Sequence, residues 1–219
     1  MRTTPFDRAP AHRNRRARAS RRIATSRSTS PAAQVKRRFV VEVPQIISIL
    51  ATMSMIGEYL RVTSAELDRA VSDPEWAMDY SEQVQDAEEE QEDIPPGEGL
   101  HFSTEKTWDM LGFLLRRFGF PVDVVKGEEE FAEDEDWGYG PPRFLPVERV
   151  ALAARELDRV SYDDLIRGVD VGELAEAKVY PLRWKSPGDL EWARDFYSQL
   201  VVFLQGAAKS RDAVIVWLD

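Results

Sequence analysis

Residues 133–146, EDEDWGYGPPRFLP, contain the side chains of this sequence that are best suited to chemistry. Asp134 or Asp136 could serve as a general base or as a metal ligand, and Arg143 could hold an anion beside them. A carboxylate that works as a general base needs a pKa shifted by burial or by a nearby charge, and a sequence reveals neither. A carboxylate-dependent enzyme is therefore one function that this stretch allows.

The same stretch supplies groups that bind a partner without reacting with it. Trp, Tyr and Arg side chains are common anchors of protein interfaces. Residues 178–184, KVYPLRW, form a proline-broken link that we expect to place two further rings near each other. The candidate binding residues are Asp136, Trp137, Tyr139, Arg143, Tyr180 and Trp184. A structural alternative stays open, in which Trp137 and Tyr139 cover the core while Arg143 pairs with nearby acids.

The backbone of this stretch cannot be the interior of a helix. Gly138 and Gly140 permit positive φ angles, while Pro141 and Pro142 fix φ and remove two hydrogen-bond donors. We therefore expect an ordered loop between two helices, and loops held on a rigid scaffold often carry binding groups.

The composition excludes several kinds of site. The sequence has no cysteine and only two histidines, His12 and His101, so thiol nucleophiles, thiolate metal sites and disulfides are excluded. The acidic run of residues 128–136 lacks the D-x-D-x-D-G register of a calcium loop, and we expect it to face water. His101 precedes a core helix, and we expect a structural role for it. The sequence predicts neither a metal nor a cofactor.

The net charge of -10 combines two unlike parts. Residues 1–52 carry twelve Lys and Arg against Asp7 and Glu42, whereas residues 53–219 carry seventeen against thirty-seven acids. The first part is interpreted as a disordered basic extension, as a misassigned start or as a targeting segment, and nucleic-acid binding would depend on it.

No apolar run reaches the roughly 20 residues of a membrane span, and we expect a cytoplasmic protein without membrane contacts.

The loop must be positioned by elements that apolar spacing predicts. Strands are predicted at residues 55–62 and 213–218. The second should be an interior strand because it is apolar on both faces, and an edge strand is predicted at residues 143–145. A core helix is predicted to begin near Ser103 and to end at Gly119, and the longest helix to begin at Ser186 and Pro187. Residues 86–99 combine acids with prolines and glycines, which predicts a solvated, mobile connector. We predict an α+β fold, with a small sheet that contains the first and last strands of one domain, residues 53–219, packed against several helices.

Five separated blocks of the sequence together resemble a known family. They are MSMIGEYLRVTSAELDRAVSDPEWA, KTWDMLGFLLRRFGFPVDVV, EDWGYGPPRFL, VYPLRW and AVIVWLD, and they resemble the YfbM-like family, domain of unknown function 1877, over residues 53–219. The resemblance implies an α+β domain of this size, and it does not indicate an activity, because the family has no established reaction or catalytic residues to carry over. The family's L-D-I-D-K-x-W run is represented here by FSTEKTW, ending at Trp108, which would weaken a carboxylate site at that place.

Two classes of function follow from these observations. The first is a non-catalytic interaction module that binds a protein partner. In its sharper form the acidic domain binds a basic protein, as an immunity protein neutralises a cationic toxin. The alternative is a carboxylate-dependent enzyme or a small-ligand-binding protein that uses the loop of residues 133–146.

Overall fold

A five-stranded antiparallel sheet forms the centre of the described structure. The computed structural model describes residues 54–91, 94–132 and 137–219. The strand order is β2-β1-β5-β4-β3, and every neighbouring pair is antiparallel. The strands are β1 (Gly57–Val62), β2 (His101–Glu105), β3 (Glu129–Glu130), β4 (Arg143–Leu145) and β5 (Ala213–Leu218). The α+β fold and the pairing of the first and last strands are thus confirmed.

Strand β5 is the central strand, as its apolar sequence predicted. Its alternate residues face opposite sides of the sheet, and five of its six residues are buried. The prediction of an edge strand at residues 143–145 is wrong, because β4 pairs with β5 on one side and with β3 on the other. The outer position is taken by β3, two exposed residues of the acidic run that was expected to face water.

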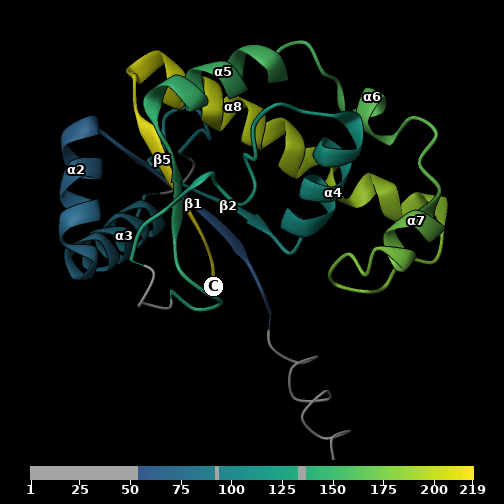
Figure 1. The fold of residues 1–219 in the computed structure, drawn as a ribbon, viewed down its shortest axis with the longest axis horizontal. Helices are drawn as coiled ribbons and strands as arrows, with labels where there is room; N and C mark the ends of the chain where they lie inside the picture. Colours follow the sequence, from purple (N-terminus) through teal and green to yellow (C-terminus); the bar gives the residue numbers. More distant parts are fainter. Residues whose placement is uncertain (1–53, 92–93, 133–136) are drawn as a thin grey trace, which may run out of the picture. The chain divides into compact units, whose positions relative to one another are not determined.

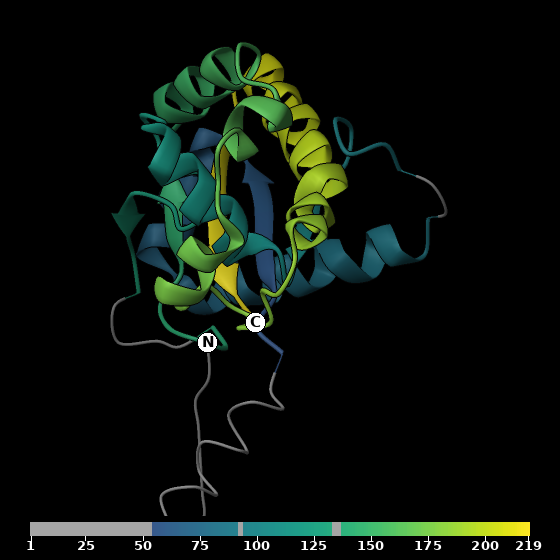
Figure 2. The same cartoon turned by 90° about the vertical axis from the view of Figure 1, so that its right-hand side faces the viewer.

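Helices cover both sides of the sheet (Figure 1). One side carries α2 (Ser64–Ser72) and α3 (Pro74–Glu89). The other side carries α4 (Trp108–Phe118), α5 (Val147–Leu157), α6 (Tyr162–Ile166), α7 (Val171–Glu176), the 3-10 helix η1 (Pro187–Ala193) and α8 (Arg194–Ser210). Figure 2 shows α5 and α8 side by side on this second side. The helix predicted from Ser186 is therefore divided into η1 and α8. Among the described residues, no helix combines the length and the apolar character needed to cross a membrane.

Two apolar layers follow from the alternation along β1 and β5. Tyr59 and Val216 point into the larger layer, which the α4, α5 and α8 helices complete. Leu60 and Ile215 point into the smaller layer, which α2, α3 and the residues around Trp137 complete. The sheet is therefore buried on both sides, and each layer fixes the register of the central strands.

Helix α4 begins later than its sequence predicted. The stretch from His101 to Glu105 pairs with β1, and the helix starts at Trp108. The Thr107 hydroxyl donates to the Thr104 carbonyl at 2.6 Å and turns the chain between strand and helix. The start was predicted too early because residues 101–105 pair with β1, a strand far away in the sequence, and local spacing does not reveal that pairing. The helix ends at Gly119, whose φ of 83° is the left-handed cap that was predicted.

The predicted mobile connector is largely ordered. Helix α3 continues through Glu89, and the segment that follows packs onto α8. The carbonyls of Gly97 and Gly99 each accept a hydrogen bond from Arg61, at 3.1 Å. The prediction was wrong because Arg61, which holds this segment, lies far away in the sequence. Residues 92–93 lie outside the described structure.

Candidate functional site

Residues 137–142 form a tight loop against the end of β5. The backbone N–H of Tyr139 donates to the Leu218 carbonyl at 2.8 Å, and that of Trp137 donates to the Gly140 carbonyl at 3.1 Å. Gly138 has a φ of 86°, and a Cβ added there would lie 2.7 Å from the Leu218 carbonyl oxygen. Only glycine permits this conformation and this approach together, so Gly138 has the role in residues 137–142 that its type predicted. Residues 133–136 of the predicted loop lie outside the described structure.

A hollow of about 240 Å³ lies on one side of this loop, and we call it the Tyr139 hollow. Its apolar wall comes from β5 and from the turn at Val125, and its polar groups come from Lys126 and Glu130. It is smaller than the roughly 300–1,000 Å³ of most small-molecule sites. Two of the predicted binding residues, Tyr139 and Arg143, meet here.

The guanidinium of Arg143 is not available to clamp an anion. Its Nε donates to the Gly127 carbonyl at 3.2 Å, its Nη2 donates to the Glu128 carbonyl at 2.9 Å, and its Nη1 pairs with the Glu130 carboxylate. These bonds hold β4 against the segment that leads into β3. For Arg143 the geometry agrees with the structural alternative, pairing with nearby acids.

A second hollow, of about 290 Å³, lies on the opposite side of the loop, and we call it the Trp137 hollow. It is bounded by α3, by the loop and by the end of β5. Its lining residues are Met78, Ser81, Glu82, Gln85, Trp137, Gly138, Trp217 and Asp219. Trp137 is only 4% exposed and contacts Phe131 and Trp217 edge to face, with ring centres 5.9 and 5.6 Å apart. Its Nε1 has no hydrogen-bond partner among the described residues. Trp137 is thus both part of the core and a wall of a hollow.

Helix α3 carries a stripe of exposed carboxylates beside the Trp137 hollow. The stripe, which we call the α3 stripe, consists of Glu75, Asp79, Glu82, Asp86 and Glu89. Their spacing of four, three, four and three residues places them on one face of the helix. None of them forms an ion pair within the part of the chain that the structure describes. Sequence reasoning missed this stripe, although the spacing of the acids was a signal that could have found it.

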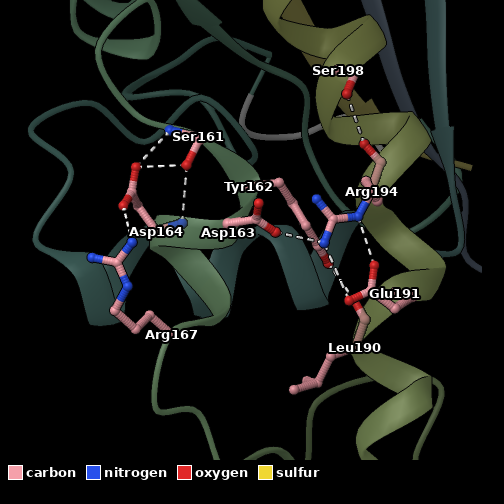
Figure 3. Close-up of polar contacts among 9 residues, drawn as sticks. All are labelled: Ser161, Tyr162, Asp163, Asp164, Arg167, Leu190, Glu191, Arg194 and Ser198. Carbon is pink, nitrogen blue, oxygen red and sulfur yellow. Dashed lines mark hydrogen bonds and ion pairs between the residues drawn. The ribbon is translucent and has the colours of Figure 1, made fainter.

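Several acids elsewhere in the described structure are paired with arginines, and Figure 3 shows the fullest case. Arg194 bonds to Asp163 at 2.8 Å and to Glu191 at 2.6 Å, and its guanidinium lies 4.8 Å from the ring centre of Tyr162. The Tyr162 hydroxyl donates to the Leu190 carbonyl. Arg194 lowers the pKa of Glu191, which stays ionised as a partner. Each charged side chain drawn here has a partner of opposite charge within the chain, and the cluster joins α6 to α8.

The most buried carboxylate on the α3 side of the sheet is Glu58. It is 8% exposed, and its Oε2 lies 2.7 Å from Nε2 of His101. The Ser103 hydroxyl donates to the other oxygen at 3.1 Å. On α3, Glu88 accepts the backbone N–H of His101 at 3.1 Å. None of these residues lines either hollow, and each fixes β2 in place, which agrees with the structural role expected for His101.

Tyr180 and Trp184 lie on the other side of the sheet and line neither hollow. The Tyr180 ring stacks on Trp108 at 5.9 Å, and its hydroxyl accepts the backbone N–H of Met55 at 3.2 Å. Trp184 is 8% exposed and donates from Nε1 to the Val179 carbonyl at 2.7 Å. The structure therefore does not bring the six predicted residues together.

The acids proposed for catalysis cannot be placed in the hollows. Asp134 and Asp136 lie outside the described residues. Over residues 54–91, 94–132 and 137–219, no group of three His, Asp or Glu side chains is arranged to hold a metal ion. The described residues form the partly aromatic Trp137 hollow, which has acids on its rim, and the α3 stripe beside it. Together these two features are suited to binding a positively charged group.

Comparison with known proteins identifies the family. The crystal structure of YfbM, a protein of unknown function from Escherichia coli, matches 75% of this chain and 99% of that one, with a TM-score of 0.55 and 15% identity. At that identity the likeness concerns the fold alone. No curated protein matches the sequence. The family model for the domain of unknown function DUF1877 matches residues 53–217. The chain therefore belongs to the DUF1877 family.

Proposed function

We propose that this domain is a non-catalytic interaction module whose partner is a positively charged protein. The partner contacts the α3 stripe and the Trp137 hollow beside it. In this proposal the partner's charge complements the excess of acids over bases in residues 53–219. The module would work as an immunity protein does when it covers a cationic toxin.

The α3 stripe is the observation that carries this proposal. Like charges four residues apart cost a helix about 0.2–0.5 kcal/mol per pair. Asp86 and Glu89 lie in the last turns, where the helix dipole also disfavours negative charge. The described helix α3 contains no Lys or Arg that would offset these costs. A helix with a purely structural role would gain from such a residue, as α8 gains from Arg194. A cationic partner supplies the missing charge.

The charge distribution also supports fast, selective encounter. A surface with one sign of charge attracts an oppositely charged protein over about the Debye length, roughly 10 Å at 0.1 M salt. Such attraction raises the association rate and weakens as salt is added. Salt sensitivity is therefore the expected signature of this interface.

The carboxyl groups of the described residues favour binding over general acid–base catalysis. Wherever a pKa is shifted, it is lowered, by arginine partners or by hydrogen bonds from hydroxyl and backbone N–H groups near helix starts. The groups are Glu128, Glu156, Asp164, Glu173, Asp189 and Glu191. A general base at neutral pH works best with a pKa raised toward 7. Lowered values belong to acids that stay ionised and hold structure.

The test compares two triple variants of the full chain in capture experiments from a lysate of the source organism. The stripe variant carries E82Q, D86N and E89Q. The control variant, D158N, E176Q and D195N, removes the same charge from exposed positions outside α3. We expect a partner that the wild type retains at 50 mM salt and releases at 500 mM. The stripe variant should retain at least tenfold less of it, and the control variant should retain it.

A stability measurement separates lost binding from lost structure. Because the stripe variant removes like-charge repulsion, its free energy of unfolding should rise by about 0.5–1 kcal/mol at low salt. A variant that is more stable and yet does not bind has lost a contact surface. Capture that is the same for the stripe and control variants would overturn the proposal.

A further inference from the structure

The acceptors around the Trp137 hollow are not engaged by the rest of the described chain. The Glu82 carboxylate, the Gln85 amide and the Asp219 carboxylate all line it, and none of them forms a side-chain hydrogen bond with another described residue. Ser81 donates its hydroxyl proton to the Met78 carbonyl at 2.8 Å, so toward the hollow it can only accept. The rim thus presents the negative charge and acceptor oxygens of Glu82 and Asp219, the Ser81 acceptor, and the Gln85 amide, which both donates and accepts.

The wall of this hollow is aromatic. Trp137 and Trp217 meet edge to face, with ring planes at 78°. Two other tryptophan rings carry an arginine of this chain: Arg69 lies 4.1 Å from the ring centre of Trp76, and Arg183 lies 4.3 Å from that of Trp192. Within the described residues no cation lies over Trp137 or Trp217.

We infer that the Trp137 hollow receives the side chain of a single arginine of the partner. This inference rests on the proposed function and names the group that the partner inserts. A hollow of about 290 Å³ holds one long side chain and little more. The guanidinium would donate to Glu82 and to the acceptors beside it, while its apolar stem packs against the tryptophan wall.

Arginine fits this hollow better than lysine for two reasons. Its five donors lie in one plane and can reach several acceptors at once, whereas an ammonium group acts as a point charge with three donors. Its flat, weakly hydrated guanidinium also packs against aromatic rings at a smaller desolvation cost.

The experiment titrates the purified full chain with a defined probe, the tripeptide N-acetyl-Ala-Arg-Ala-amide. Binding is followed through the indole N–H signals of the six tryptophans by NMR. We expect the signals of Trp137 and Trp217 to shift on titration and those of Trp184 and Trp192 to stay in place. Matched peptides carry lysine or citrulline at the same position. Citrulline, which has the shape of arginine without its charge, should bind at least tenfold more weakly, and lysine at least threefold more weakly.

Two variants on the same helix locate the contact. Glu82 lines the hollow, and E82Q should weaken binding of the arginine peptide about tenfold. Glu89 belongs to the α3 stripe but does not line the hollow, and E89Q should change binding less than twofold. Both residues are exposed, so neither change disturbs the core. The NMR spectrum of each free variant reports whether it is folded.

The outcomes separate this inference from the function on which it rests. Equal weakening by E82Q and E89Q, or lysine binding as tight as arginine, would mean attraction by charge alone and would overturn the inference. The proposed module would then still stand if the lysate partner depends on the stripe. Arginine binding that shifts Trp137, together with a lysate partner that ignores the stripe, would uphold the hollow as an arginine site and overturn the proposed module.

Discussion

At the scale of single residues, Arg61 holds more of the described structure together than any residue of the candidate site. It is 5% exposed, and its Nε and Nη2 bond to Oδ2 of Asp212 at 3.1 and 2.9 Å. It also donates to the carbonyls of Gly97, Gly99 and Gly206. One buried cation therefore ties β1 to the start of β5, to the segment before β2 and to α8.

We predict that R61M strongly destabilises the protein. Methionine fills the space but leaves the Asp212 carboxylate and three carbonyls without their donor, and removal of one partner of a buried ion pair costs about 3–5 kcal/mol. Urea unfolding should show that loss as a lower midpoint. The matched control is R155M, because Arg155 is exposed and pairs only at the surface, and it should change the free energy by less than about 0.5 kcal/mol. Equal effects of the two changes would contradict the role given to Arg61.

A second residue-scale prediction concerns how the ion pair between Glu128 and Arg149 makes the stability of the fold depend on pH. Arg149 lowers the pKa of Glu128 by its hydrogen bonds, and the backbone N–H of Asp123 adds to the effect. Because the pKa is lower in the folded state, the pair stabilises the fold fully at neutral pH, and this contribution is lost as the pH falls below about 4.3 toward the lowered value. Wild type should exceed E128Q by about 1 kcal/mol at pH 7 and by much less at pH 3. A difference that grows toward low pH would contradict this.

The sequence showed which residue types could form a site but not which of them meet. Trp137 and Tyr139 were identified from the loop's composition, yet they line two different hollows. Trp217 was interpreted only as part of a buried strand, and Glu82 was not singled out. Which side chains share a hollow depends on the order of β5, β4 and β3, and residues far apart in the sequence decide that order.

At the scale of elements, local patterns predicted those elements whose signals are local. Capping boxes form at Thr63, Ser161 and Asp170, and each is closed by bonds within one turn, so the sequence of that turn is enough to encode it. The end of α3 and the start of α4 were misplaced, because a distant arginine orders the segment between α3 and β2, and strand pairing delays α4. Boundaries were wrong where tertiary contacts decide them.

The contact between α8 and the segment before β2 predicts that a glycine-to-alanine change in a helix lowers the free energy of unfolding instead of raising it. Gly206 lies inside α8, where alanine normally stabilises a helix by about 0.5–1 kcal/mol. Here a Cβ would collide with the carbonyl oxygen of Gly97, so G206A should instead destabilise by about 2 kcal/mol. G188A is the control: its Cβ would meet nothing closer than the Ser186 hydroxyl, at 3.8 Å, and stability should hardly change. Thermal unfolding compares the two, and a more stable G206A would show that the close contact is absent.

At the scale of the whole molecule, the sequence predicted the class of fold because two features determined it early. The final strand is apolar on both faces, which predicts an interior strand covered by helices on at least one side. The long helices each carry one apolar face, which requires a layer to bury it. The excess of acids over bases was also visible in the composition. The composition did not show that five acids, unpaired within the described structure, lie on one face of α3, because only the structure shows which acids form ion pairs.

The last prediction concerns how much of the chain the fold needs. Among the described residues, which begin at residue 54, both apolar layers are built from Met55 onward, and the backbones of Ile56 and Asp219 bond to each other in both directions, at 2.6 and 2.9 Å, where β1 begins. A chain that starts at Met53 should therefore unfold in one cooperative transition, with a free energy within about 0.5 kcal/mol of the full chain and the same dependence on urea. A chain that starts at Thr63 lacks β1, the partner of both β2 and β5, and should not fold. Urea unfolding followed by circular dichroism distinguishes these results. A shallow or absent transition for the chain from Met53 would show that residues 1–52 contribute to the folded domain.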